Sequence, residues 1–183
     1  MAISNLDPAS ALILVDLQNG ILAYPTIHPI AGVLDRAAAL ARAFREQRRP
    51  VVLVNVAGGA PGRAEQGRRA GELPPEALLF APELDQQPFD LVVTKRTWGA
   101  FTATGLEQIL RDAGVTQVVI GGVATSIGVE STARQAHELG FNVALAVDAM
   151  TDTSVEAHAN SVERIFPRLG ETGRVEDVIA LLL

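Results

Sequence analysis

Short runs of consecutive apolar residues alternate along this chain with longer amphipathic stretches. The runs are rich in Val, Ile and Leu, and each stops at a polar residue or a glycine. Unbroken rather than alternating apolarity is typical of strands that are covered on both faces. We therefore predict five buried strands, at residues 11–15, 51–54, 91–94, 117–120 and 143–147.

The stretches between these runs repeat apolar residues at helical spacing. In residues 31–49 the apolar positions share one face and arginines lie opposite. Thr153–Glu156 has the form of a capping box, which predicts a helix start with Val155, Val162 and Ile165 facing inward. Further helices are predicted at 104–113, from about 125 to 139 and at 175–182. This alternation predicts a parallel sheet with helices on both faces, in a single domain covering residues 1–183.

Ligands bind such sheets at the carboxyl ends of the strands, and two of these ends carry unusual side chains. Asp16 follows the first run, where a carboxylate is costly unless it is paired, although an aspartate can also cap its own turn. Lys95 follows the third run and is the only lysine in the chain. The alternative is that Lys95 is a surface lysine that occurs at this position by chance. An ion pair across adjacent strand ends would explain both residues.

The fourth run leads through Gly121 and Gly122 into the helix that ends near Gly140, a residue type typical of helix C-termini. Thr125 or Ser126 is the predicted N-cap, which would leave other first-turn amides free. Such a turn can bind an anion or an oxyanion. An ordinary strand-to-helix connection is the alternative.

Other segments are informative in different ways. Residues 57–75, which include Arg63, Arg68 and Arg69, form the longest irregular segment and are predicted to be a lid or binding loop. Trp98 and Phe101 are candidates for the wall of a pocket for a flat ligand, although aromatic residues more often belong to the core. Asp148 is predicted to end the fifth strand and to have a structural role in a turn that runs to Asp152.

Composition excludes several classes of function. The formal charge of −6 and the pI of about 5.0 argue against a nucleic-acid or anionic-membrane partner. No apolar run approaches the length of a membrane span, and the N-terminus lacks a basic region, which predicts a cytoplasmic protein. The chain has no cysteine, and its three histidines lack metal-ligand spacing. We therefore predict no metal and no cofactor.

Four motifs, taken together, resemble those of the isochorismatase-like (cysteine hydrolase) family. They are Leu14–Asn19, Lys95–Phe101, Gly122–Thr132 and the less specific Asp148–Asp152. The resemblance implies a three-layer α/β/α sandwich with five or six mostly parallel strands, Rossmann-like topology and frequent oligomers. It also implies hydrolysis of a small molecule, with Asp16 and Lys95 as two members of a catalytic Asp–Lys–Cys triad.

The same resemblance assigns further site residues. The family's catalytic cysteine corresponds to Gly128, so a thioester route is excluded. A cis peptide bond is expected between Val123 and Ala124, with the amides of Ala124 and Gly128 forming an oxyanion hole. The predicted substrate pocket consists of Gln18, Trp98, Phe101 and Thr125.

True isochorismatases are similar at the cysteine position, where an aspartate protonates a vinyl ether without a covalent intermediate. Asp16 would then be a general acid, which requires a raised pKa, whereas a nearby Lys95 would lower that pKa. The loop after the second strand lacks a glutamine associated with those enzymes, and it lacks the metal ligands of nicotinamidase-like relatives. A hydrolase of another substrate, using water or Ser126, and a catalytically silent binding or scaffold protein remain the alternatives.

Overall fold

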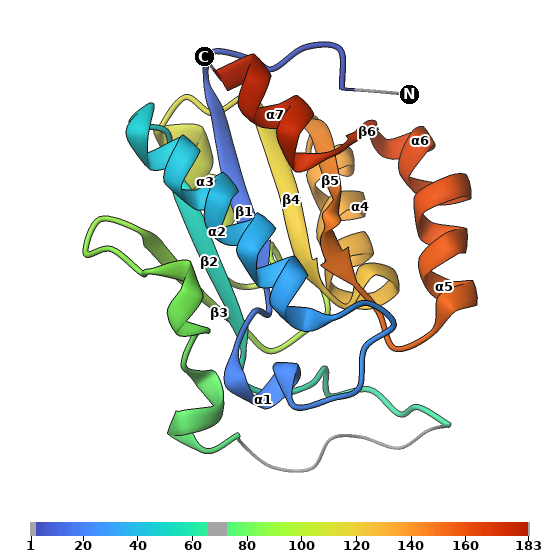
Figure 1. The fold of residues 1–183 in the computed structure, drawn as a ribbon. Coiled ribbons are helices and arrows are strands. Elements are labelled where there is room, and N and C mark those ends of the chain that lie inside the picture. Colours follow the sequence, from blue (N-terminus) through green and yellow to red (C-terminus); the bar gives the residue numbers. More distant parts are fainter. Residues whose placement is uncertain (1–2, 66–72, 183) are drawn as a thin grey trace.

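A computed structural model of the protein describes residues 3–65 and 73–182. Six parallel strands form one sheet in the order β3-β2-β1-β4-β5-β6 (Figure 1). Their bounds are β1 Ser10–Val15, β2 Val51–Val56, β3 Leu91–Lys95, β4 Gln117–Val123, β5 Asn142–Thr151 and β6 Glu171–Gly173. The predicted α/β fold with a parallel sheet is therefore confirmed.

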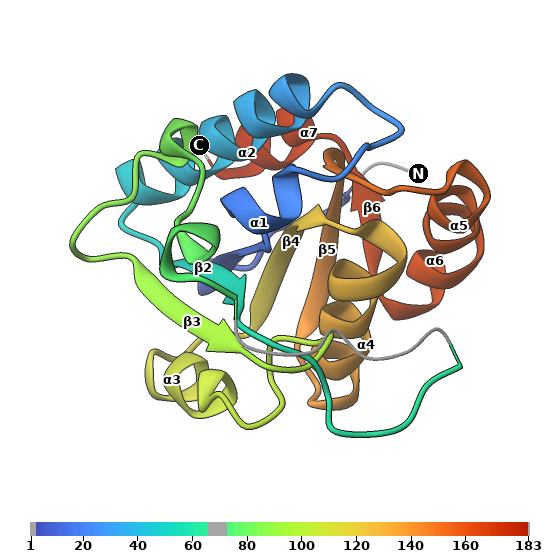
Figure 2. The ribbon, with the colours of Figure 1, turned by 90° about the horizontal axis from the view of Figure 1, so that it is seen from below.

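Helices cover both faces of the sheet (Figure 2). One face packs against α2 Ile30–Glu46 and α7 Val175–Leu182. The other face packs against α3 Leu106–Asp112, α4 Glu130–Glu138 and α6 Phe166–Leu169, and α5 Val155–Asn160 lies on the same side. The short helix α1 Asn19–Leu22 follows β1, and π-helical turns at Thr125–Val129 and Ser161–Ile165 precede α4 and α6.

The first strand shows how the chain builds two apolar layers. Leu12 and Leu14 point into the layer under α2, whereas Ala11, Ile13 and Val15 point into the layer under α3 and α4. Successive side chains of a strand face opposite sides of the sheet, so an unbroken apolar run supplies both layers. Every residue of β1 is buried, which places its carboxyl end in the middle of the molecule.

The fifth strand is longer than predicted. It continues to Thr151, and its pairing with β4 shifts register between Ile120 and Gly122. Asp148 therefore lies within the strand and does not end it. Its carboxylate accepts a hydrogen bond from Val175 N at 2.8 Å and pairs with Arg36 at 3.2 Å, so its contacts are structural, as predicted.

The capping box was predicted one residue too early. Ser154, not Thr153, is the N-cap of α5, and its side chain accepts a hydrogen bond from Ala157 N at 3.2 Å. Val155 is 61% exposed and does not face inward, whereas Val162 and Ile165 pack against the core. Among the described residues no helix is long and apolar enough to cross a membrane.

Candidate functional site

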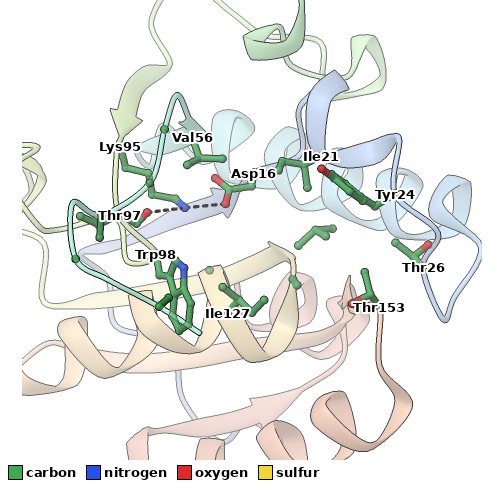
Figure 3. A pocket seen from close by; sticks show the side chains of 18 of the residues that line it. Asp16, Ile21, Tyr24, Thr26, Val56, Lys95, Thr97, Trp98, Ile127 and Thr153 are labelled. Atoms are coloured by element: carbon green, nitrogen blue, oxygen red, sulfur yellow. Dashed lines mark hydrogen bonds and ion pairs between the residues drawn. The ribbon is translucent and has the colours of Figure 1, made fainter. Parts of the chain in front are cut away.

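Asp16 and Lys95 form a buried ion pair at the carboxyl edge of the sheet (Figure 3). Lys95 Nζ donates to Asp16 Oδ2 at 2.7 Å and to the carbonyl oxygen of Thr97 at 3.3 Å. The side chains of Lys95 and Asp16 are only 2% and 7% exposed. The predicted convergence of the two residues is confirmed.

The two strand ends are not adjacent, which corrects one detail of the prediction. β2 lies between β1 and β3, so the lysine side chain crosses the end of β2 near Val56. Asp16 has a φ of 54°, a left-handed conformation that aspartate tolerates better than most residues. The chain thus turns sharply as β1 ends, and the carboxylate remains buried beside the ammonium.

The turn after β4 carries the third element of the site. The peptide bond between Val123 and Ala124 is cis, as predicted. Gly128 is buried in the turn Thr125–Val129, and a Cβ atom on it would lie 3.1 Å from Asp16 Oδ2. The carboxylate therefore sits against the position where a side chain at residue 128 would begin.

The cap of this turn differs from the prediction. Ala124 is the N-cap residue, and neither Thr125 nor Ser126 caps the turn with its side chain. Asp152 instead accepts a hydrogen bond from Ser126 N at 2.7 Å, although sequence reasoning assigned Asp152 no role. The local sequence contained no signal for this role, because Asp152 follows the mixed segment Asp148–Thr151 and not an apolar run.

A cavity of about 440 Å³ opens above the ion pair. Its walls are mainly apolar and aromatic, and Trp98 stands at the mouth with 65% of its surface exposed (Figure 3). Among the described residues that line it, the charged ones are Asp16, Lys95 and Arg63. The other lining residues include Ile21, Tyr24, Thr26, Val56, Thr97, Val123, Ala124, Ile127, Gly128 and Thr153.

Three of the four predicted pocket residues do not line the cavity. Phe101 packs against Phe141 in the core, with ring centroids 6.0 Å apart. Thr125 is fully buried and its hydroxyl pairs with His158 Nδ1 at 2.9 Å. Gln18 is also fully buried, and its side-chain amide holds the backbone of Val56 through bonds of 2.6 and 3.1 Å. Only Trp98 lies where a ligand can reach it.

The first part of the predicted binding loop, residues 57–75, lines the cavity. Residues 58–60 and 62–64 line the wall, and Arg68 and Arg69 lie outside the described residues. Sequence reasoning missed Ile21, Tyr24 and Thr26, which approach the cavity from α1 and the loop after it. A short helix after an aspartate offers no periodic pattern that would place these side chains.

Two histidines lie behind the turn. The rings of His28 and His158 meet edge to face with centroids 5.0 Å apart. Burial lowers the pKa of His158 below its ordinary value of 6.5, the nearby His28 lowers it further, and Asp152 partly offsets both effects. Within residues 3–65 and 73–182, no group of three or more His, Asp or Glu side chains is placed to hold a metal ion.

We expect the pH dependence of stability to report this lowered pKa. As pH falls below 6.5, His158 takes up a proton in the unfolded chain before it does so in the folded protein. The free energy of unfolding therefore decreases as pH falls below that value. Urea unfolding between about pH 7 and pH 5 should show that the free energy of unfolding decreases less with falling pH in His158→Gln than in the wild type. His137→Gln, at an exposed histidine, is the control, and equal slopes in both variants would contradict the expectation.

Comparisons with known proteins point to one family. The model of the isochorismatase domain family matches residues 10–177. The isochorismatase family protein YecD of Escherichia coli O157:H7 is 40% identical over 94% of this chain and 96% of its own length. YwoC of Bacillus subtilis is 38% identical over 93% and 92%. The structure of an isochorismatase family protein from Burkholderia thailandensis superimposes with a TM-score of 0.94 at 41% identity, covering 99% of both chains.

Proposed function

Because the chain belongs to the isochorismatase family, we propose that it hydrolyses a small, largely apolar metabolite without forming a covalent enzyme intermediate. The proposal rests on one observation above all. A carboxylate–ammonium pair lies at the floor of an apolar cavity, against a glycine and not against a nucleophilic side chain. A chain without cysteine has no thiol to attack a substrate. In the proposed reaction the oxygen of a water molecule therefore forms the new bond to the substrate.

In this mechanism Asp16 moves the proton. Lys95 donates to Asp16 Oδ2, which orients the carboxyl group and favours its ionised form, whereas the apolar walls favour the neutral form. A carboxylate takes a proton from the attacking water, as amide or ester hydrolysis requires. A neutral carboxyl group donates a proton to the terminal carbon of a vinyl ether. Water then adds to the resulting cation and returns a proton to the Asp16 carboxylate, and the hemiketal breaks down to a ketone and an alcohol.

The turn after β4 is proposed to stabilise the developing negative charge when the substrate is an amide or ester. Backbone amides that point at the position of an oxyanion contribute without reorganisation, because the fold already holds them in place. The amides of Ala124 and Gly128 are the proposed donors. Asp152 supports this arrangement because it accepts a hydrogen bond from Ser126 N, between those two residues in the turn.

The pH profile distinguishes the two roles of Asp16. If the carboxylate is a base, kcat/KM rises as pH increases through the pKa of the group, and if the carboxyl group is an acid, kcat/KM falls. Turnover of a vinyl ether in D2O gives a second readout, because protonation at carbon places deuterium in the new methyl group. Vinyl ethers, amides and esters should therefore be tested side by side.

Asp16→Asn is the test of the whole proposal. Asparagine has the same shape and tolerates the left-handed backbone, but it cannot move the proton. We expect kcat to fall by about 10²–10⁴-fold, while ligand binding is retained. The single tryptophan, Trp98, stands at the cavity mouth, so its fluorescence measures binding independently of turnover. Undiminished turnover by the purified variant would refute the assignment of Asp16.

A catalytically silent binding protein is the second candidate, and the missing thiol favours it. In that case ligands would change the fluorescence of Trp98, but no member of the substrate panel would be consumed. A serine mechanism has less support, because the imidazole of His158 hydrogen-bonds to the buried Thr125 and none of the described histidines forms a hydrogen bond with Ser126. Full activity of Ser126→Ala would remove the serine mechanism entirely.

A further inference from the structure

Side chains from segments far apart in the sequence meet at the turn after β4. The end of β5 brings Asp152, whose carboxylate accepts a hydrogen bond from Ser126 N at 2.7 Å. Helix α5 brings His158, whose Nδ1 lies 2.9 Å from the hydroxyl oxygen of Thr125. The loop between α1 and α2 brings His28 against His158, and it passes beside the connection from β5 to α5 (Figure 1). The turn is therefore held in place by side chains outside it.

The buried threonines determine which nitrogen of each imidazole carries the proton. Thr125 is fully buried, and within the described part of the chain its hydroxyl has no hydrogen-bond partner other than His158 Nδ1. A buried hydroxyl proton needs an acceptor, so the hydroxyl donates and Nδ1 of a neutral ring accepts. Thr151 is equally buried; its hydroxyl oxygen accepts from His28 N at 3.3 Å and lies 3.1 Å from His28 Nδ1. Both rings are thus neutral acceptors at Nδ1 and carry their proton on Nε2.

Protonation of His158 reverses this arrangement. A charged imidazole donates from both ring nitrogens and accepts at neither. The oxygen of Thr125 would then accept from the ring, and the hydroxyl proton would lose its acceptor in a fully buried site. A buried donor without an acceptor is costly. The neutral ring of His158 therefore supports the turn, whereas the charged ring does not.

The surroundings of His158 set the pH at which the ring becomes charged. Burial is the main effect that lowers the pKa of His158 below its ordinary value of 6.5, and His28 lowers it further, whereas Asp152 raises it. Both imidazoles line a second cavity of about 660 Å³, which gives protons from the solvent a route to them. The change is therefore expected below pH 6.5.

Other charged groups on the neighbouring elements are paired with one another. Arg36 on α2 and Arg174 before α7 line the same cavity, and both pair with Asp148 of β5, at 3.2 and 3.7 Å. On α4, which follows the turn, Glu130 pairs with Arg134 at 2.9 Å. Burial, His28 and Asp152 therefore remain the main influences on the charge of the ring.

We propose that neutral His158 is a positioning residue, which holds the turn after β4 in place through Thr125, and that protonation of its ring releases the turn. The coupling between ring and turn follows from the hydrogen bond between these two residues alone. Its effect on catalysis rests on the proposed function, because the amides of Ala124 and Gly128 in this turn are the proposed oxyanion donors. Turnover of an amide or ester is therefore expected to decrease when the ring becomes charged.

Nuclear magnetic resonance of the isotope-labelled chain tests the coupling without any substrate. At about pH 7.5, where a histidine of ordinary pKa is neutral, the imidazole nitrogen shifts should show that Nδ1 of His158 carries no proton. As pH falls, the backbone amide signals of Thr125 and Ser126 should move with the same midpoint as the ring, below pH 6.5. His158→Gln should abolish this midpoint at both amides, whereas His137→Gln should leave it unchanged.

Three further variants separate the hydroxyl from the space that it fills. Thr125→Val keeps the shape of the side chain but removes the hydroxyl, so the turn amides should lose most of their pH-dependent shift. Thr125→Ser keeps a hydroxyl and should retain that shift. His28→Gln removes a ring that lowers the pKa of His158, so the midpoint should move upward. Circular dichroism of each variant verifies that the fold is intact.

Kinetics then test the effect on catalysis with any amide or ester that the chain hydrolyses. At about pH 7.5, Thr125→Val should lower kcat by about tenfold or more, with little change in KM, because the oxyanion donors are displaced while the cavity is unchanged. Thr125→Ser should restore kcat. An unchanged kcat in Thr125→Val would remove the positioning role of His158.

The outcomes also separate this inference from the proposed function. Turn amides that titrate with His158, and that lose this titration in Thr125→Val but not in Thr125→Ser, support the coupling. A proton on Nδ1 of His158 at neutral pH overturns it, as do turn amides that do not follow the ring. If the chain consumes no amide or ester, the proposed oxyanion role of the turn fails, and the nuclear magnetic resonance shifts alone decide the coupling.

Discussion

Lys95→Met will lower the free energy of unfolding by about 3–5 kcal/mol, the usual cost of removing one partner from a buried ion pair. The ammonium is only 2% exposed and lies 2.7 Å from Asp16 Oδ2. Methionine fills a similar volume but cannot donate a hydrogen bond, so the buried carboxylate of Asp16 loses its ion pair with Lys95. Urea unfolding followed by circular dichroism measures the loss.

A double variant separates charge from packing. Lys95→Met combined with Asp16→Asn removes both charges, so the double variant should regain much of the stability that Lys95→Met alone loses.

Lys95→Arg keeps the positive charge at this position but changes the shape of the charged group. The planar guanidinium does not fit a site built for one ammonium, so we expect a folded protein without activity. Normal turnover by Lys95→Arg would show that the single lysine is a compositional accident.

The layered fold followed from the sequence because its elements are defined by local patterns. The run Ala11–Val15 is apolar throughout, and a strand with this pattern must be covered on both faces. The pairing of Asp16 with Lys95 followed from the same logic, since a polar residue that ends a buried strand needs a partner. Strand order was not determined by these patterns, which is why β2 was not expected between them.

The errors lie where tertiary contacts override local signals. The fifth strand was predicted to stop at Asp148, but Asp148 is neutralised by Arg36 and caps α7, so β5 continues to Thr151. The N-cap of the turn after β4 was assigned to a local hydroxyl, whereas Asp152, distant in sequence, provides the acceptor. Neither contact leaves a trace in the pattern of neighbouring residues.

Pocket residues were the hardest to predict. Trp98 and Phe101 lie three residues apart, yet one stands at the cavity mouth and the other packs in the core. Their local sequences do not separate these two environments, because both are single aromatics beside glycine, alanine or threonine. The tryptophan is exposed because the segment after Lys95 passes over the ion pair, which only the assembled sheet determines.

Gly128→Cys will fold and carry a thiol that is alkylated much faster than an ordinary cysteine. A Cβ at this position would lie 3.0 Å from Val15 Cγ1 and 3.1 Å from Asp16 Oδ2, so small shifts of both side chains are required. Such crowding costs about 1–3 kcal/mol. The φ of Gly128 is not positive, so the backbone itself accepts a side chain.

Two features of the site should activate this thiol. The Lys95 ammonium, one hydrogen bond away from Asp16, and the start of the helix that continues into α4 both favour a thiolate. Asp16, in direct contact with the new side chain, can accept the thiol proton. Since the natural chain has no cysteine, every alkylation event reports residue 128 alone.

The rate of alkylation by iodoacetamide against pH is the measurement. Gly128→Ala controls for the crowding without a thiol. Thr153→Cys places a thiol on the cavity wall instead of in the turn after β4 and serves as the reference. We expect the thiol at 128 to react at least tenfold faster than the reference at neutral pH, and to hydrolyse activated esters weakly. A thiol that titrates at or above about 8.5, the ordinary value for cysteine, would mean that the Asp16 carboxylate cancels the effect of Lys95 at this position. The site would then lack the positive potential that oxyanion stabilisation requires. That result would support the alternative that the chain is a catalytically silent binding protein.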